Sequence, residues 1–154
     1  MNVYSVTQTS GNNSMFYART ATVHGRDNGV ILFDGLERQM AEFDARSDIL
    51  LDEVARNFVM PAYSVVREIL NEHKILPEIL VEGVPYLKRF FGVDSIVTLR
   101  ISVDTTGSPM LYAVVMWSGS IREVREALEQ FDRSWWLARS WQAAGYLVFT
   151  YELT

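Results

Sequence analysis

The chain has 154 residues, of which 49% are hydrophobic and 21% are charged. This composition excludes wholesale disorder and fits a single folded domain over residues 1–154. No cysteine is present, which excludes disulfides, zinc–cysteine sites and iron–sulfur clusters. We expect a cytoplasmic protein, because the sequence shows neither a signal-peptide pattern nor a run of about 18 apolar residues that could span a membrane.

Negative charge is concentrated in one segment. The net charge is −5, and the segment from Asp34 to Glu53, with seven acidic and two basic residues, accounts for all of it. Nucleic-acid binding requires a basic face, so we expect no nucleic-acid partner. The segment is either a solvated helix face or a docking surface for a basic protein, and Asp44, Asp48 and Asp52, spaced four residues apart, are its candidate contacts.

The N-terminal residues predict a mobile stretch followed by a hairpin. Residues 1–14 are polar, and we expect them to be mobile. Residues 16–23 alternate in polarity, and the turn sequence Asp27-Asn28-Gly29 precedes an apolar run over 30–33. Because Asn-Gly is favoured in the type I′ turns of hairpins, the pattern predicts a β-hairpin over residues 15–33.

The middle of the chain has helical periodicity. Apolar residues recur at steps of three and four, which predicts a helical segment over residues 36–91, with Ser47 as a helix N-cap. Pro61 predicts a kink, or a junction of two helices near Met60, because proline lacks the amide hydrogen of a helix interior. Further prolines and glycines predict short helices over 77–82 and 85–91, each opened by proline and closed by glycine.

The C-terminal part, residues 95–153, predicts a ββαβ unit. Alternation over 96–103 and an apolar run over 110–117 indicate two strands, the second covered on both sides. Ser120 and Glu123 form a capping box that starts a helix, and alternation over 147–153 indicates a last strand. A helical crossover makes the last strand parallel to the second. We therefore predict an α+β fold with helices packed on a small mixed sheet.

One C-terminal motif resembles a known family. Phe131-Asp132, Trp135-Trp136-Leu137 and a closing strand containing Glu152 are similar to the FDxxWWL pattern of a family of small bacterial proteins of uncharacterised function. The resemblance covers about residues 75–153. It implies a bacterial origin and supports the ββαβ order, and it implies no particular chemistry.

Residues for catalysis or metal binding are sparse. His24 and His73 are far apart and lack the spacing of metal ligands. The sequence contains neither a GxSxG nucleophile elbow nor a glycine-rich phosphate loop. The row of aspartates lies in the most acidic segment, where a solvated surface is expected instead of a pair with separated pKa values. We therefore predict no catalytic residue, no cofactor and no metal site.

The tryptophans are the unusual feature of the sequence. The alternatives for Trp117, Trp135, Trp136 and Trp141 are that they fill a core beneath the sheet, leave rings exposed as anchors for a partner, or form a surface on which sugars or bases stack. The negative net charge of the chain disfavours stacking on nucleic acid. If the helix from Ser120 continues through Asp132, Trp135 extends its buried stripe and Trp136 falls on the flank. The candidate partner-binding residues are therefore Trp136, Arg133 and Arg139, besides Asp44, Asp48 and Asp52.

These patterns favour a protein-interaction or regulatory module without catalytic activity, of the antidote or adaptor type, that binds a protein partner or a second copy of itself. The alternative is a small enzyme or ligand-binding domain with a pocket between the helices and the sheet. An enclosed pocket with converging polar groups would favour the alternative. A broad exposed apolar surface would favour the interaction module.

Overall fold

The structure is a computed structural model. It describes residues 29–103 and 105–154, apart from the side chains of residues 29–36, 43 and 44. The chain divides into two units, Met1–Glu37 and Arg38–Thr154, and the fold below is that of the second. The predicted mobile residues 1–14 and residues 15–28 of the predicted hairpin lie outside the described residues. Residues 30–33, predicted as a strand, belong instead to helix α1 (Gly29–Asn57), because a short apolar run suits a helix as well as a strand.

Two more helices precede the sheet, α2 (Tyr63–Glu72) and α3 (Ile75–Phe91). The junction between α1 and α2 contains Pro61, which confirms the predicted interruption near Met60. Ser47 lies inside α1 and is therefore no N-cap. Its hydroxyl accepts a hydrogen bond from Lys74 Nζ at 3.2 Å, which ties α1 to the start of α3.

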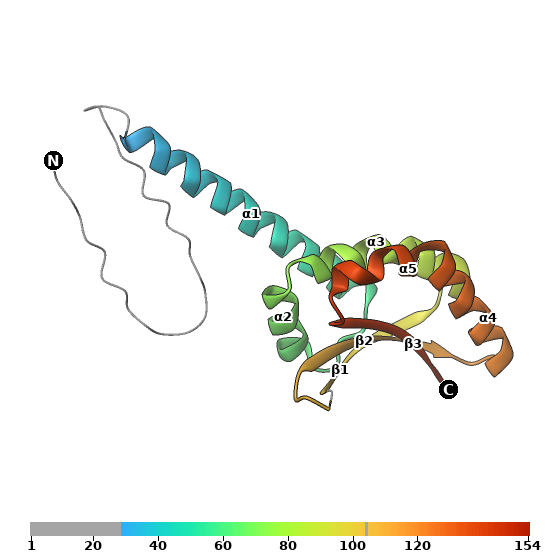
Figure 1. The fold of residues 1–154 in the computed structure, drawn as a ribbon. Coiled ribbons are helices and arrows are strands. Elements are labelled where there is room, and N and C mark those ends of the chain that lie inside the picture. The colour runs from blue at the N-terminus through green and yellow to red at the C-terminus, as the bar shows by residue number, and fades with distance from the viewer. Residues whose placement is uncertain (1–28, 104) are drawn as a thin grey trace. The chain divides into compact units, whose positions relative to one another are not determined.

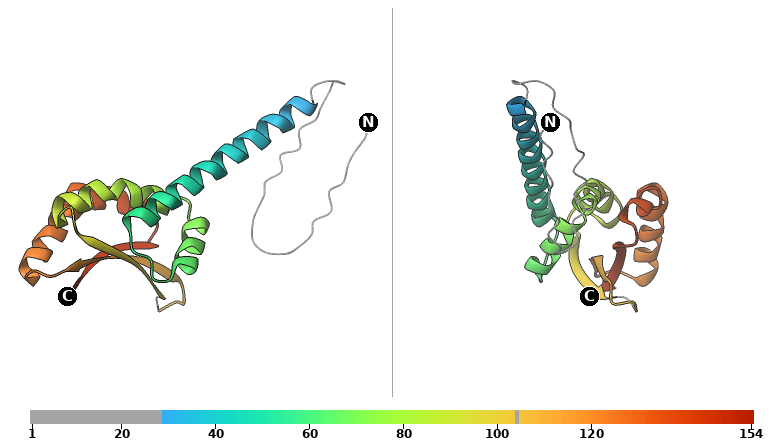
Figure 2. Two further views of the ribbon diagram at one scale, coloured as in Figure 1. Left: turned by 180° about the vertical axis from the view of Figure 1, so that it is seen from behind. Right: turned by 60° about the vertical axis from the view of Figure 1, so that its left-hand side comes forward.

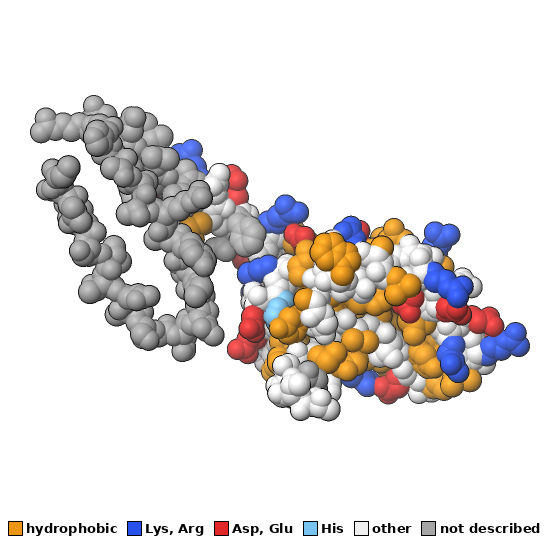
Figure 3. All heavy atoms as spheres, in the orientation of Figure 1, with side chains coloured by type: hydrophobic (Ala, Val, Ile, Leu, Met, Phe, Trp, Pro, Cys, Tyr) orange, Lys and Arg blue, Asp and Glu red, His pale blue; other side chains and the backbone are white. Residues whose placement is uncertain are grey.

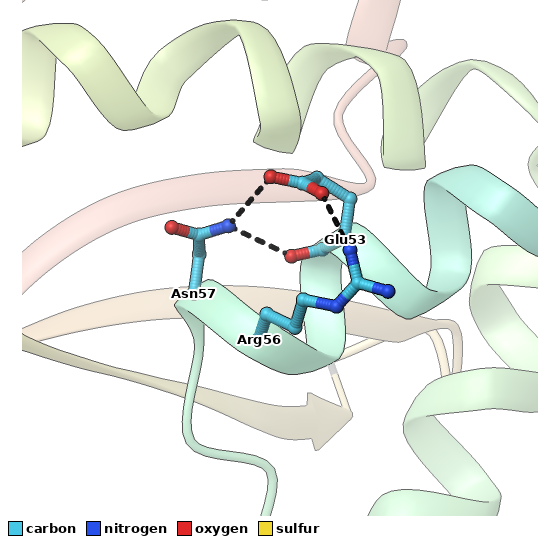
Figure 4. A network of polar contacts seen from close by, with 3 residues as sticks. All are labelled: Glu53, Arg56 and Asn57. Carbon is cyan, nitrogen blue, oxygen red and sulfur yellow. Dashed lines mark hydrogen bonds and ion pairs between the residues drawn. The ribbon is translucent and has the colours of Figure 1, made fainter.

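The last turn of α1 is held by a small polar network (Figure 4). The Asn57 amide donates to the Glu53 carbonyl at 2.9 Å and to the Glu53 carboxylate at 3.2 Å. Arg56 donates to the same carboxylate at 3.2 Å. These bonds all lie within residues 53–57, so they stabilise the last turn of α1.

The sheet has three strands, β1 (Ile96–Val103), β2 (Pro109–Trp117) and β3 (Leu147–Leu153). Strand β2 is central, antiparallel to β1 and parallel to β3, which confirms the predicted ββαβ order and the α+β class. At the outer edge of β1, the Val59 N–H donates to Val97 O at 2.9 Å, and the Leu99 N–H donates to Val59 O at 2.8 Å. Strand β3 lies at the other edge and has no further strand beside it among the described residues.

The connection from β2 to β3 is a run of consecutive helical pieces, α4 (Ile121–Phe131), η1 (Asp132–Trp136), α5 (Leu137–Arg139) and η2 (Ser140–Ala143). Helices α3, α4 and α5 lie on one face of the sheet (Figures 1 and 2). The buried strand residues on that face are Val97, Leu99, Leu111, Ala113, Val115, Leu147 and Phe149.

The other face of β2 is covered less completely than predicted. Val114 is buried there, but Met110, Tyr112 and Met116 remain half-buried. Alternation places these four side chains together, opposite the face that packs on α3 and α4. The prediction of full cover on both sides therefore holds for only part of this strand.

Helix α3 corrects the prediction of two short helices. It runs unbroken from Ile75 to Phe91, with Gly83 and Pro85 inside it. Its buried residues lie on both sides of the proline, at Leu76, Ile79, Leu80, Leu87 and Phe91. Core packing of both halves keeps the helix continuous although Pro85 lacks an amide hydrogen.

The N-terminus of α4 has the predicted capping box. The Glu123 N–H donates to Ser120 Oγ at 3.3 Å, and the Ser120 N–H donates to the Glu123 carboxylate at 2.9 Å. The Ser120 hydroxyl also donates to this carboxylate, at 2.8 Å. These bonds, from the backbone first and the hydroxyl second, lower the pKa of Glu123 below its ordinary value.

The capping box leads to two predictions, and the second depends on pH. Replacing Ser120 with alanine should lower the free energy of unfolding by about 1 kcal/mol, because the first turn of α4 loses its side-chain acceptor.

The second prediction concerns Glu123. Because the pKa of Glu123 is lower in the folded state, its contribution to stability is present above the ordinary value of 4.5 and is lost as the pH falls through the folded value. Urea titrations of wild type and Glu123→Gln should therefore differ at neutral pH and converge in acid. A difference that persists in acid would contradict this assignment.

Candidate functional site

The candidate residues predicted on the C-terminal helices are already engaged within the chain. Arg133 is exposed and forms an ion pair with Glu129 one turn earlier. Arg139 forms an ion pair with Glu82 of α3. Trp136 is half-buried, and its ring centroid lies 4.8 Å from that of Phe149. The ion pair of Arg139 therefore joins α5 to α3, and the ring of Trp136 packs η1 against β3.

The acidic candidates lie elsewhere, on α1. Asp48 and Asp52 are exposed, and Asp48 lies 3.9 Å from Arg67 of α2. The side chain of Asp44 is outside the described set. Between the described side chains, no hydrogen bond or ion pair joins these aspartates to the residues on η1 and α5. The structure therefore does not bring the six predicted residues into one site.

A different set of residues forms an open surface groove. It has a volume of about 630 Å³ and runs between α4 and β3. On the strand side, Tyr151 contributes to its lining. On the helix side, its lining residues are Ile121, Arg122, Arg125, Glu126, Leu128, Glu129 and Asp132. We call this the α4–β3 groove.

Two opposite charges in the α4–β3 groove lack partners. Arg122 pairs with Glu126 at 3.0 Å, and Glu129 pairs with Arg133. The side chains of Arg125 and Asp132, by contrast, form no ion pair or hydrogen bond with any described residue. Asp132 is half-buried, and this burial raises the pKa of its carboxyl group. Basic and acidic side chains alternate over α4 on the surface (Figure 3).

Apolar side chains accompany these charges. Ile121 is 53% exposed, while Leu128 and Tyr151 are half-buried. Residues 121, 125, 128 and 132 recur at steps of four and three, so they form one stripe along α4. The groove thus combines an apolar surface, a free cation and a partly desolvated carboxylate, a combination suited to binding another protein chain.

Exposed apolar residues also gather on the surface over α5 and β3 (Figure 3). Leu137 is 62% exposed and Trp141 is 73% exposed, so the most exposed tryptophan is Trp141 and not Trp136. The sequence left open which tryptophans are exposed, and the candidate residues predicted from it included Trp136 but not Trp141. Sequence reasoning also missed the groove residues Arg125 and Asp132. Steps of three and four residues along the sequence place both on one side of a helix, which is a signal that could have been used.

Histidine and carboxylate groups do not converge on a metal site in the described part of the chain. His73 caps the C-terminus of α2, and its ring stacks on Tyr146 with centroids 3.9 Å apart. Within residues 29–103 and 105–154, no cluster of three or more His, Asp or Glu side chains could hold a metal ion. No helix in these ranges is both long and apolar enough to cross a membrane.

Comparisons with family models, curated proteins and solved structures found no match to this chain. The resemblance through the FDxxWWL pattern stays a prediction. In the structure, the motif residues divide between two roles. Phe131 and Trp135 are buried in the core, and Asp132 lines the α4–β3 groove.

Proposed function

We propose that this chain is a protein-interaction or regulatory module that binds another protein chain through the α4–β3 groove. The observation that carries the proposal is the pair of unpartnered charges, Arg125 and Asp132, beside the unpaired edge of β3. A partner that supplied charges to both residues would also offset the cost of desolvating Asp132. In keeping with the resemblance of its C-terminal motif, we place the protein in the cytoplasm of a bacterium, as an adaptor or antidote.

The alternative of a small enzyme or ligand-binding domain would need an enclosed pocket between the helices and the sheet. The α4–β3 groove is open to solvent, and the space beneath the helices is occupied by aromatic rings. The centroid of Phe131 lies 5.0 Å from that of Phe149 and 5.4 Å from that of Trp135. Such packing leaves an apolar core at the position where a ligand would have to bind.

The proposal is tested by comparing the proteins that bind to the full chain and to groove variants. Tagged wild type, Ile121→Glu and Arg125→Glu are used for capture from host cells, and the bound proteins are quantified by mass spectrometry. Lys88→Glu, an exposed change on α3 outside the groove, is the matched control. We expect proteins that bind to wild type and to the control but not to the groove variants. Identical sets of bound proteins for all four baits would overturn the proposal.

A further inference from the structure

We infer that the α4–β3 groove takes a second copy of this chain, with the β3 strands of the two copies paired antiparallel across a two-fold axis. This inference rests on the proposed function, because it names the partner of the same groove. It is carried by three properties of the groove, namely the direction of the β3 backbone groups, the absence of two kinds of edge protection and the order of charges along α4.

Half of the backbone groups of β3 point away from β2. The Tyr146 carbonyl accepts from Leu111 N, and the Thr154 N–H donates to Trp117 O, each at 2.9 Å. Because backbone groups alternate in direction along a strand, even-numbered residues of β3 bond to β2. The odd-numbered residues, from Leu147 to Leu153, therefore direct their N–H and C=O groups toward the free edge. A second strand would satisfy them.

Strand β3 also lacks two of the devices that prevent edge pairing. It contains no proline, and Glu152 is its only charged residue. Glu152 forms an ion pair with Arg100 of β1, across β2, so this charge is held on the face away from the groove. At about 3.3 Å per residue, the seven residues of β3 form an edge of roughly 23 Å, of which the part from Tyr151 to Leu153 is the more exposed, since Leu147 and Phe149 are only 2% and 6% exposed.

The charges on α4 favour an antiparallel arrangement of the two copies. Arg122 and Arg125 line the N-terminal half of the groove, Glu126 lies near its middle, and Glu129 and Asp132 line the C-terminal half. Arg122 already pairs with Glu126, and Glu129 with Arg133, so Arg125 and Asp132 are the two charges that a partner would have to match. A two-fold axis reverses the direction of the second helix, so Arg125 of each copy faces Asp132 of the partner subunit. A parallel arrangement would instead place like charges together, which is unfavourable.

Apolar residues fit the same arrangement. With the axis at Thr150, every outward backbone group of β3 finds a partner, and Phe149 lies opposite Tyr151 of the partner subunit. Leu153, which is 48% exposed, then lies beside Leu147 of the partner subunit. Ile121 and Leu128 add apolar surface between the two α4 helices. The product is a continuous sheet of six strands with helices on one face.

The test uses the full chain and two charge variants of α4. The acidic variant carries Arg122→Glu and Arg125→Glu, and the basic variant carries Glu129→Arg and Asp132→Arg. Lys88→Glu serves as the control. The mass of each protein is measured over a range of concentrations by sedimentation equilibrium, and circular dichroism checks that each variant is folded.

We expect wild type and the control to dimerise with the same dissociation constant. Each charge variant alone should show a dissociation constant raised at least about tenfold, because like charges now face each other. An equimolar mixture of the two variants should dimerise again, since one copy then lines the groove with acidic residues and the other with basic residues apart from Glu126. Misfolding of either variant could not produce this recovery of dimerisation in the mixture.

Two results would overturn the inference. One is a wild-type chain that stays monomeric at all concentrations. The other is a dimer that both charge variants retain, since it would have to use another face. If the chain is monomeric but the groove variants still lose captured proteins, the proposed function survives and the partner is a different protein.

Discussion

Replacing Trp135 with alanine is expected to lower the free energy of unfolding by about 3 to 5 kcal/mol. The side chain is only 5% exposed, and its ring packs on those of Tyr86 and Phe131, with centroids 5.3 and 5.4 Å away. Removing it leaves a cavity that the helices on either side cannot readily close. Urea unfolding of the variant, followed by circular dichroism, measures the loss.

The neighbouring tryptophans provide the controls. Trp136→Ala should cost about 1 to 2 kcal/mol, because the ring is half-buried against Phe149. Trp141→Ala should leave stability nearly unchanged, since this side chain is 73% exposed. Equal losses at Trp135 and Trp136, or a larger one at Trp136, would contradict the packing described here.

Replacing Gly83 with valine should cost about 3 kcal/mol, because it overpacks the contact between α3 and Trp135. A Cβ at this position would lie 2.8 Å from Cη2 and 3.0 Å from Cζ3 of the indole, before any further carbon is added. The ring cannot move away easily, because other aromatic rings surround it. Urea titration of the variant measures the effect.

A double-mutant cycle separates this contact from helix propensity. Gly83→Ala gains about 1 kcal/mol of helix propensity but suffers the same close contact, so its net effect should be small in wild type. In a Trp135→Leu background the contact is gone, and the same alanine should be stabilising. An identical effect of Gly83→Ala in both backgrounds would show that Trp135 does not limit the space at Gly83.

The C-terminal half of the fold was predictable because its signals are local. The Ser120–Glu123 capping box marks the start of α4, and strict alternation marks the strands on either side of the crossover. The different burial of Trp135 and Trp136 also agrees with the phase expected of a helix that begins at Ser120, although both residues lie in η1, whose wider turn was not predicted. In each case neighbouring residues carry the information, so no knowledge of distant contacts was needed.

The errors arose where tertiary packing decides the structure. Pro85 and Gly83 are helix-breaking residues by propensity, yet burial of Leu80 and Leu87 on either side of Pro85 keeps α3 continuous. The groove could not be predicted, because it depends on which side of α4 faces β3. Asp132 illustrates this, since its sequence neighbours do not reveal that β3 leaves it half-buried.

The piece η1 determines where the chain length can vary. In η1 the Leu137 N–H bonds to the carbonyl of Asp132, five residues earlier, so this turn holds one residue more than a turn of α-helix. The extra residue is absorbed within this turn, so deleting Ser134 should restore regular α-helix without rotating the residues beyond it. Arg139 would stay near Glu82, and Ala143 would stay in the core. Natural length variants of this protein should therefore lose a residue within η1 more readily than within α4, where a deletion rotates the rest of the helix by about 100°.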